Sequence, residues 1–164
     1  MMKKKAEVAK RLRVIARESR YSRLLMNMVL MCPEKTVIPH SIFCLHDKVL
    51  AQIKGTLRLY ETGGILGASI DATNTVTAFH FDSTGRTEHS TYTPDVGNLN
   101  RVIAEWAEEG IEFVGFVHSH PKEDCKLSKP DIEYADKIKE VCSLPQVLMV
   151  IYLPDTEAIY PYVI

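Results

Sequence analysis

The chain has 164 residues, of which 46% are hydrophobic and 25% are charged, and its formal net charge is −1. This length and this balance predict one soluble globular domain with enough apolar side chains for a core, and they give no electrostatic reason to expect a nucleic-acid partner. None of the four cysteines forms a Cys-X-X-Cys pair. A zinc ribbon or a thioredoxin-like site is therefore not indicated, and we expect reduced thiols in a cytoplasmic protein.

The first 33 residues differ in composition from the rest. They are rich in Lys and Arg, and their apolar residues fall at helical spacing: Val8, Leu12 and Ile15. The apolar run at residues 24–31 is too short to span a bilayer, and the basic stretch before it is too long for a signal peptide. Because Pro33 ends this run, we predict a basic helical extension over residues 1–33 and a domain over residues 34–164. A solvated basic face is the simpler interpretation of the extension, although a membrane surface or an acidic partner could also contact it.

From residue 36 onward, short segments with strand-like and helix-like apolar spacing alternate. Strands are predicted at residues 36–38, 63–70, 75–82, 111–118, 146–153 and 158–164. Helices are predicted after the N-cap residues Ser41, Thr93 and Ser128. We expect the first helix to bury Ile42, Leu45, Val49 and Ile53, and residues 82–93 to form a polar loop. This order predicts an α/β fold in which helices flank a mixed sheet.

His118 and His120 end one of the predicted strands, where residues i and i+2 point to the same face. Asp131 stands near the start of the helix that Ser128 caps, and residues 121–127 are long enough to bring it beside the histidines. Two imidazoles and a carboxylate suit zinc and leave a fourth position for water, as in catalytic sites. Each half of the pattern can also arise without a metal, because Ser-X-X-Asp is a plain capping motif as well.

Glu61 lies directly before a predicted buried strand that opens with Gly63 and Gly64. A carboxylate there is poorly placed for packing and well placed to reach a site at a strand end, and the glycines permit close approach of other groups. Taken alone, a surface glutamate in a turn is the simpler interpretation of Glu61.

The stretches ETGGILG and HSHPKEDCKLSKPD together resemble the signature of the JAMM, or MPN-plus, metalloproteases of the Mov34/JAB family. That signature is a glutamate, then His-X-His, seven residues, a serine, two residues and an aspartate. The matching residues here are Glu61, His118, His120, Ser128 and Asp131. The resemblance extends from about residue 36 to residue 164, leaves out residues 1–33, and implies a single MPN-type domain.

The resemblance also implies roles for these residues. His118, His120 and Asp131 would hold Zn²⁺, Glu61 would act as the general base, and Ser128 would help to stabilise the oxyanion. The implied reaction is hydrolysis of the bond after the C-terminal Gly-Gly of a ubiquitin-like protein.

Two features favour a compact prokaryotic type of this family: residues 82–93 leave little room for a first insertion, and a long second insertion is not seen. The expected partners are then a ThiS- or MoaD-like protein or its conjugates, and an E1-like enzyme encoded nearby. Two other functions remain open, namely a non-catalytic module that binds such tails and a zinc hydrolase of small amide conjugates. We interpret Cys125 as an ordinary loop residue.

Overall fold

Helices and strands alternate along the chain in the computed structural model, which describes residues 44–71, 75–88, 91–121 and 124–164. The strands are β1 (Cys44–Leu45), β2 (Gly63–Ser69), β3 (Thr75–Phe81), β4 (Arg86–Glu88), β5 (Thr91–Thr93), β6 (Ile111–Ser119), β7 (Leu148–Leu153) and β8 (Ala158–Val163). The helices are α2 (Asp47–Thr56), α3 (Val96–Glu108) and α4 (Lys129–Cys142). The predicted basic helix in residues 1–33, the strand at residues 36–38 and the cap residue Ser41 lie outside the described residues.

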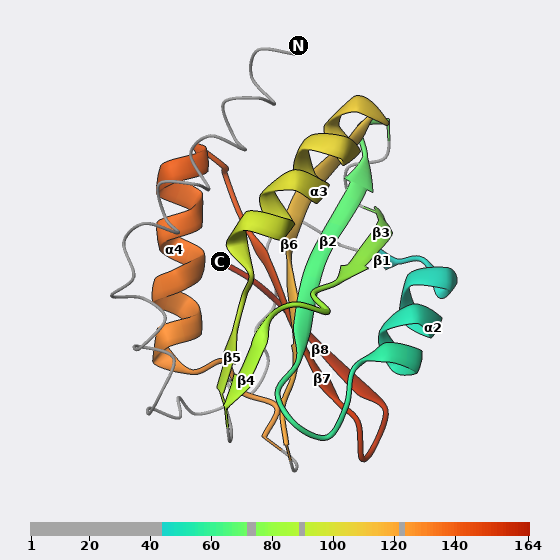
Figure 1. Cartoon of the computed structure of the whole chain (residues 1–164), viewed down its shortest axis with the longest axis vertical. Coiled ribbons are helices and arrows are strands. Elements are labelled where there is room, and N and C mark those ends of the chain that lie inside the picture. Colours follow the sequence, from blue (N-terminus) through green and yellow to red (C-terminus); the bar gives the residue numbers. More distant parts are fainter. Residues whose placement is uncertain (1–43, 72–74, 89–90, 122–123) are drawn as a thin grey trace.

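Six strands form one mixed sheet in the order β1-β3-β2-β6-β7-β8. β1 runs parallel to β3 and β6 runs parallel to β7, whereas all other neighbours are antiparallel. Strands β4 and β5 pair with each other in a separate hairpin. Helices α3 and α4 cover one face of the large sheet and α2 covers the other (Figure 1). The prediction of an α/β domain with a mixed sheet flanked by helices is therefore confirmed.

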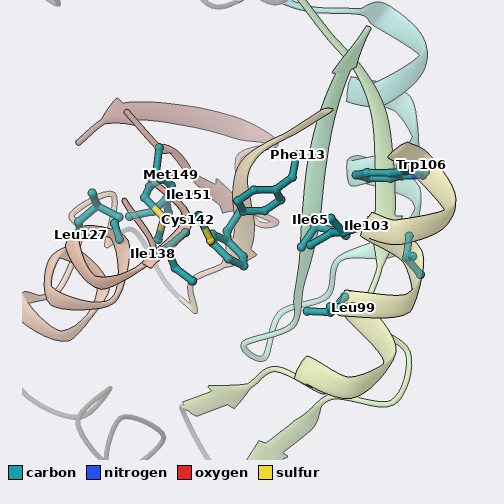
Figure 2. Packing of buried hydrophobic residues seen from close by; sticks show 14 of the residues in the cluster. Ile65, Leu99, Ile103, Trp106, Phe113, Leu127, Ile138, Cys142, Met149 and Ile151 are labelled. Carbon is teal, nitrogen blue, oxygen red and sulfur yellow. The ribbon is translucent and has the colours of Figure 1, made fainter. Parts of the chain in front are cut away.

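Two apolar clusters hold the helices on the sheet. The larger cluster packs α3 and α4 against β2, β6 and β7, and Figure 2 shows members of it: Ile65, Leu99, Ile103, Trp106, Phe113, Ile138, Met149 and Ile151. The second cluster packs α2 against the opposite face, through Val49, Ile53, Leu66, Val117 and Val150. Because both faces are covered, β7 is buried along its whole length, which explains its uninterrupted apolar sequence.

Two predicted helix starts were wrong. Helix α2 begins at Asp47, and its N-cap is His46, whose Nδ1 accepts a hydrogen bond from the backbone N–H of Lys48 at 3.2 Å. Leu45, expected on the apolar face of that helix, instead pairs with Val76 as part of β1. Helix α3 is capped by Asp95 and not by Thr93, because the Asp95 carboxylate reaches the N–H of Asn98 at 3.1 Å.

The segment predicted as a polar loop, residues 82–93, contains the β4–β5 hairpin. Thr93 is the last residue of β5 and pairs with Arg86 of β4. The hairpin lies near the ends of α3 and α4 on the same side of the sheet (Figure 1). Among the helices that the structure describes, none is long and apolar enough to cross a membrane.

Candidate metal centre

Strand β6 carries the first two predicted ligands into the interior. It lies between β2 and β7, so that His118 is opposite Gly63 on one side and Ile151 on the other. His118 and His120 point to the same face of the strand, and their Nε2 atoms lie 2.8 Å apart. Both side chains are buried. The i, i+2 spacing thus aims two ring nitrogens at one point.

Asp131 reaches the same point from the first turn of α4. Ser128 is the N-cap of this helix, and the two residues form a capping box in which each side chain bonds the backbone of the other. Oδ2 of Asp131 accepts hydrogen bonds from the Ser128 N–H at 2.8 Å and from its Oγ at 2.7 Å. The same oxygen lies 3.7 Å from Nε2 of His118. The cap therefore fixes the carboxylate beside the histidines.

The three side chains offer ligand atoms that all lie within 4.8 Å of one another. Among the residues described by the structure, His118, His120 and Asp131 are the group of histidine, cysteine and acidic side chains placed to hold a metal ion. Nδ1 of His120 lies 2.9 Å from the carbonyl oxygen of Asp124. Because a carbonyl only accepts, Nδ1 must carry the proton, which leaves a lone pair on Nε2 for a metal.

The protonation state of His118 also suits a metal ligand. Burial lowers the pKa of its imidazole to about 4, against the opposing attraction of the Asp131 carboxylate. The ring is therefore neutral at pH 7 and has a lone pair to donate. Two imidazoles and one carboxylate match the donor set of a zinc site with three protein ligands.

Glu61 lies near the end of the sheet at which His118 stands. Gly63 pairs with His118 in the antiparallel ladder, and the ladder continues to a backbone hydrogen bond from the Ser119 N–H to the Thr62 carbonyl at 2.8 Å. Glu61 stands two residues before Gly63, just beyond the end of this ladder. Oε2 of Glu61 accepts a hydrogen bond from the backbone N–H of Tyr92 at 3.2 Å.

The environment of the Glu61 carboxyl makes it a proton acceptor near neutral pH. Burial raises its pKa to about 7, the hydrogen bond from Tyr92 opposes this rise, and the negative charges of Asp131 and Asp124 add to it. The repulsion by Asp131 means that Glu61 and the predicted ligand lie close enough to interact. A carboxyl whose pKa is close to the working pH is suited to both accepting and donating a proton.

The roles of Tyr92, which bonds Glu61, and of Asp82, which bonds Tyr92, were not predicted from the sequence. Tyr92 is anchored by its hydroxyl, which donates to Oδ2 of the buried Asp82 at 2.6 Å. Its ring fills the space next to Gly63, where an added Cβ would lie 2.5 Å from Cε1 of Tyr92. Gly63, the first residue of β2, was the available signal in the sequence: it predicted a close approach of another group but not that this group is the Tyr92 ring.

Comparisons with known proteins agree with this architecture. The family model for prokaryotic homologs of the JAB domain matches residues 46–159, which is more than half of the chain. A Desulfitobacterium hafniense protein whose structure was determined in solution superposes with a TM-score of 0.53 over 74% of this chain and 82% of that one. It is 17% identical, so the likeness shows the fold alone. A search of curated proteins gave no significant match. The match over residues 46–159 and the shared fold establish that the chain belongs to the prokaryotic JAB-domain family.

Proposed function

We propose that the protein is a zinc-dependent isopeptidase or peptidase. The observation that carries this proposal is the convergence of His118, His120 and Asp131 within 4.8 Å, with Glu61 close enough to Asp131 for their charges to interact. The JAB family contains zinc peptidases as well as members without catalysis. The ligand set and the base are both present here, which favours a catalytic member.

His118, His120 and Asp131 would hold the zinc, which supplies a Lewis acid and lowers the pKa of water towards neutrality. Glu61 accepts the proton of the attacking water and later donates it to the leaving amine. The pKa of about 7 in the metal-free protein makes both transfers accessible to this carboxyl. Ser128 has two roles in this scheme. Its hydroxyl holds the Asp131 carboxylate, and it would turn its hydrogen towards the oxyanion when substrate is bound.

The substrate class that we propose is an extended C-terminal tail that ends in Gly-Gly, as in ThiS- or MoaD-like proteins and their conjugates. The β4–β5 hairpin stands beside Glu61, because Thr87 Oγ1 donates to the Glu61 carbonyl at 2.8 Å and Tyr92 bonds its carboxylate. Within the described residues, β4 and β5 pair only with each other, so a tail could pair with the outer edge of either strand. Glycines at the scissile bond would let the tail pass the buried site without side-chain clashes. An E1-like enzyme that activates the same tail in the cytoplasm is the expected second partner.

The test is a panel of linear fusions in which a ThiS- or MoaD-like protein ending in Gly-Gly precedes a reporter domain. We expect zinc-loaded protein to release the reporter, chelated protein to leave it intact, and fusions with the last glycine changed to valine to be cut much more slowly.

Each alternative function predicts a different outcome of this panel. Tight binding of the fusion without cleavage would identify a tail-binding module. Faster turnover of small amino-acid amides than of any fusion would identify a hydrolase of small conjugates. Equal cleavage of the glycine and valine fusions would contradict the idea that the site is too narrow for side chains at the scissile bond.

A further inference from the structure

Ser119 lies between the two predicted metal ligands in the sequence, and its side chain points to the opposite face of β6. It is fully buried, with 0% of its surface exposed. A serine hydroxyl inside an apolar core must find hydrogen-bond partners, because burying it without them costs free energy. The partners of Ser119 therefore indicate what this residue does.

All side-chain partners of Ser119 belong to the segment that carries Glu61. The Ser119 hydroxyl oxygen accepts from the backbone N–H of Thr62 at 3.0 Å and lies 3.1 Å from the Thr62 hydroxyl. It donates to the backbone carbonyl of Tyr60 at 3.0 Å, with the Thr62 carbonyl at 3.2 Å as a second acceptor. One hydroxyl thus contacts the backbone on both sides of Glu61, across 57 residues of sequence.

These bonds matter because the Glu61 segment is not part of a strand. Regular pairing between β2 and β6 ends at Gly63 and His118, so Glu61 lies beyond the last paired residues. The exposed side chains of Leu59 and Tyr60, which are 58% and 56% accessible, contribute little burial that would hold this segment in place. Its anchors are the contacts to Ser119 and, from the other side, those to Thr87 and Tyr92.

We propose that Ser119 is a positioning residue for the general base. Its buried hydroxyl ties the end of the ligand-bearing strand to the backbone on both sides of Glu61, and so it fixes the Glu61 carboxylate relative to His118 and His120. In this way three consecutive residues serve both functions. His118 and His120 place two ligands on one face of the strand, and Ser119, on the opposite face, orients the base. This inference rests on the proposed catalytic role of Glu61 and deepens it.

The variant that tests this is Ser119→Ala, which removes the hydroxyl and leaves the histidines untouched. Because a small misplacement of a catalytic group costs up to about 100-fold in rate, we expect kcat to fall about 10- to 100-fold. KM and zinc content should stay close to the wild-type values, since the Ser119 hydroxyl bonds the backbone of Tyr60 and Thr62 and not the predicted ligand side chains.

Two matched variants separate positioning from stability. Thr62→Val removes the Thr62 hydroxyl but keeps the bonds of the Ser119 hydroxyl to the Thr62 N–H and to the Tyr60 carbonyl. If these backbone bonds decide the rate, kcat should stay within about threefold of wild type. Val49→Ala opens a cavity in the apolar cluster that packs α2 on the face of the sheet opposite α3 and α4. It should lower the melting temperature and leave kcat unchanged. A fall in kcat for Val49→Ala equal to that for Ser119→Ala would overturn the proposal, because general destabilisation would then explain both.

Amide hydrogen exchange in the zinc-free protein gives a readout that does not depend on activity. The Thr62 N–H bonds Ser119 directly, whereas the Tyr92 N–H bonds the Glu61 carboxylate and does not contact Ser119. A purely local role of Ser119 would speed exchange at Thr62 alone. Positioning of Glu61 predicts faster exchange at Tyr92 as well, in Ser119→Ala and not in Val49→Ala.

The outcomes distinguish this inference from the proposed function. If the wild type cleaves no fusion but Tyr92 still exchanges faster in Ser119→Ala, the peptidase assignment fails and the placement of Glu61 by Ser119 stands. If Tyr92 exchange and kcat are both unchanged in Ser119→Ala, Ser119 does not position the base, whatever the substrate is.

Discussion

Replacing Glu61 by glutamine in the metal-free protein should make it more stable at alkaline pH. The substitution keeps the size of the side chain and its capacity to accept the hydrogen bond from the Tyr92 N–H. It removes the cost of holding a charged carboxylate in a partly buried site near Asp131. A charged carboxylate in a partly buried site lowers the free energy of unfolding. Replacing it by the neutral glutamine should therefore raise this free energy.

The size of the effect follows from the pKa of Glu61, which burial raises from 4.5 to about 7 in the folded protein. The two values differ by about 2.5, which corresponds to about 3.4 kcal/mol, and partial exposure of the side chain reduces this to roughly 1–2 kcal/mol. The folded state binds more protons than the unfolded state between these two pKa values. Stability therefore falls as the pH rises from about 4.5 to about 7, and the full penalty is present above pH 7.

The assay is thermal unfolding of wild type and Glu61→Gln in the presence of a chelator, at pH 8 and at pH 4. At pH 8 the variant should unfold about 2–8 °C higher, and at pH 4 the two should coincide. His118, whose pKa is lowered to about 4 by burial, gives both proteins the opposite slope and cancels in the difference. The exposed Glu112 supplies the control, because Glu112→Gln should change stability by no more than about 0.5 kcal/mol at either pH. A Glu61→Gln protein that is no more stable than wild type at pH 8 would refute the reasoning.

Three further outcomes are expected. Elemental analysis should find about one zinc per wild-type chain and little in His118→Ala, because two remaining ligands compete poorly with chelators; full zinc in that variant would remove His118 from the site. Ser128→Ala should retain zinc, lose about 1 kcal/mol of stability with its cap, and turn over more slowly, whereas an unchanged rate would leave Ser128 a cap alone. Gly63→Ala should lower both melting temperature and rate, because its Cβ would lie 2.5 Å from the Tyr92 ring and 2.8 Å from the Val117 carbonyl; wild-type activity would show that the ring is free to move.

The convergence of His118, His120 and Asp131 could be predicted from the sequence because local geometry determines most of it. Two histidines at i and i+2 on a strand must share a face, and a Ser-X-X-Asp cap places its aspartate at a defined position in the first helical turn. The strands at residues 63–69, 111–119 and 148–153 were also predictable, because their long apolar runs are typical of strands buried on both faces.

The surroundings of Glu61 could not be predicted in the same way. The β4–β5 hairpin consists of two three-residue strands made mainly of polar and charged residues, so no apolar alternation marks it. The contacts of the hairpin with Glu61, and those of Ser119 with Tyr60 and Thr62, join residues 26 to 59 positions apart. Such contacts depend on the order of strands in the sheet, which local spacing does not determine. Thr93 was predicted to cap α3, but it pairs with Arg86 in the hairpin, and Asp95 caps the helix instead.

In the proposed reaction, a metal held by His118, His120 and Asp131 works together with Glu61 as a proton acceptor to hydrolyse an amide bond. The most direct measurement is the rate at which zinc-loaded wild type and zinc-loaded Glu61→Gln release the reporter from the same Gly-Gly fusion, with the zinc content of both proteins determined in parallel. We expect equal zinc and a rate that is about 10²- to 10⁴-fold lower in the variant. Cleavage by Glu61→Gln at the wild-type rate, or no cleavage by the fully zinc-loaded wild type, would contradict the proposed reaction.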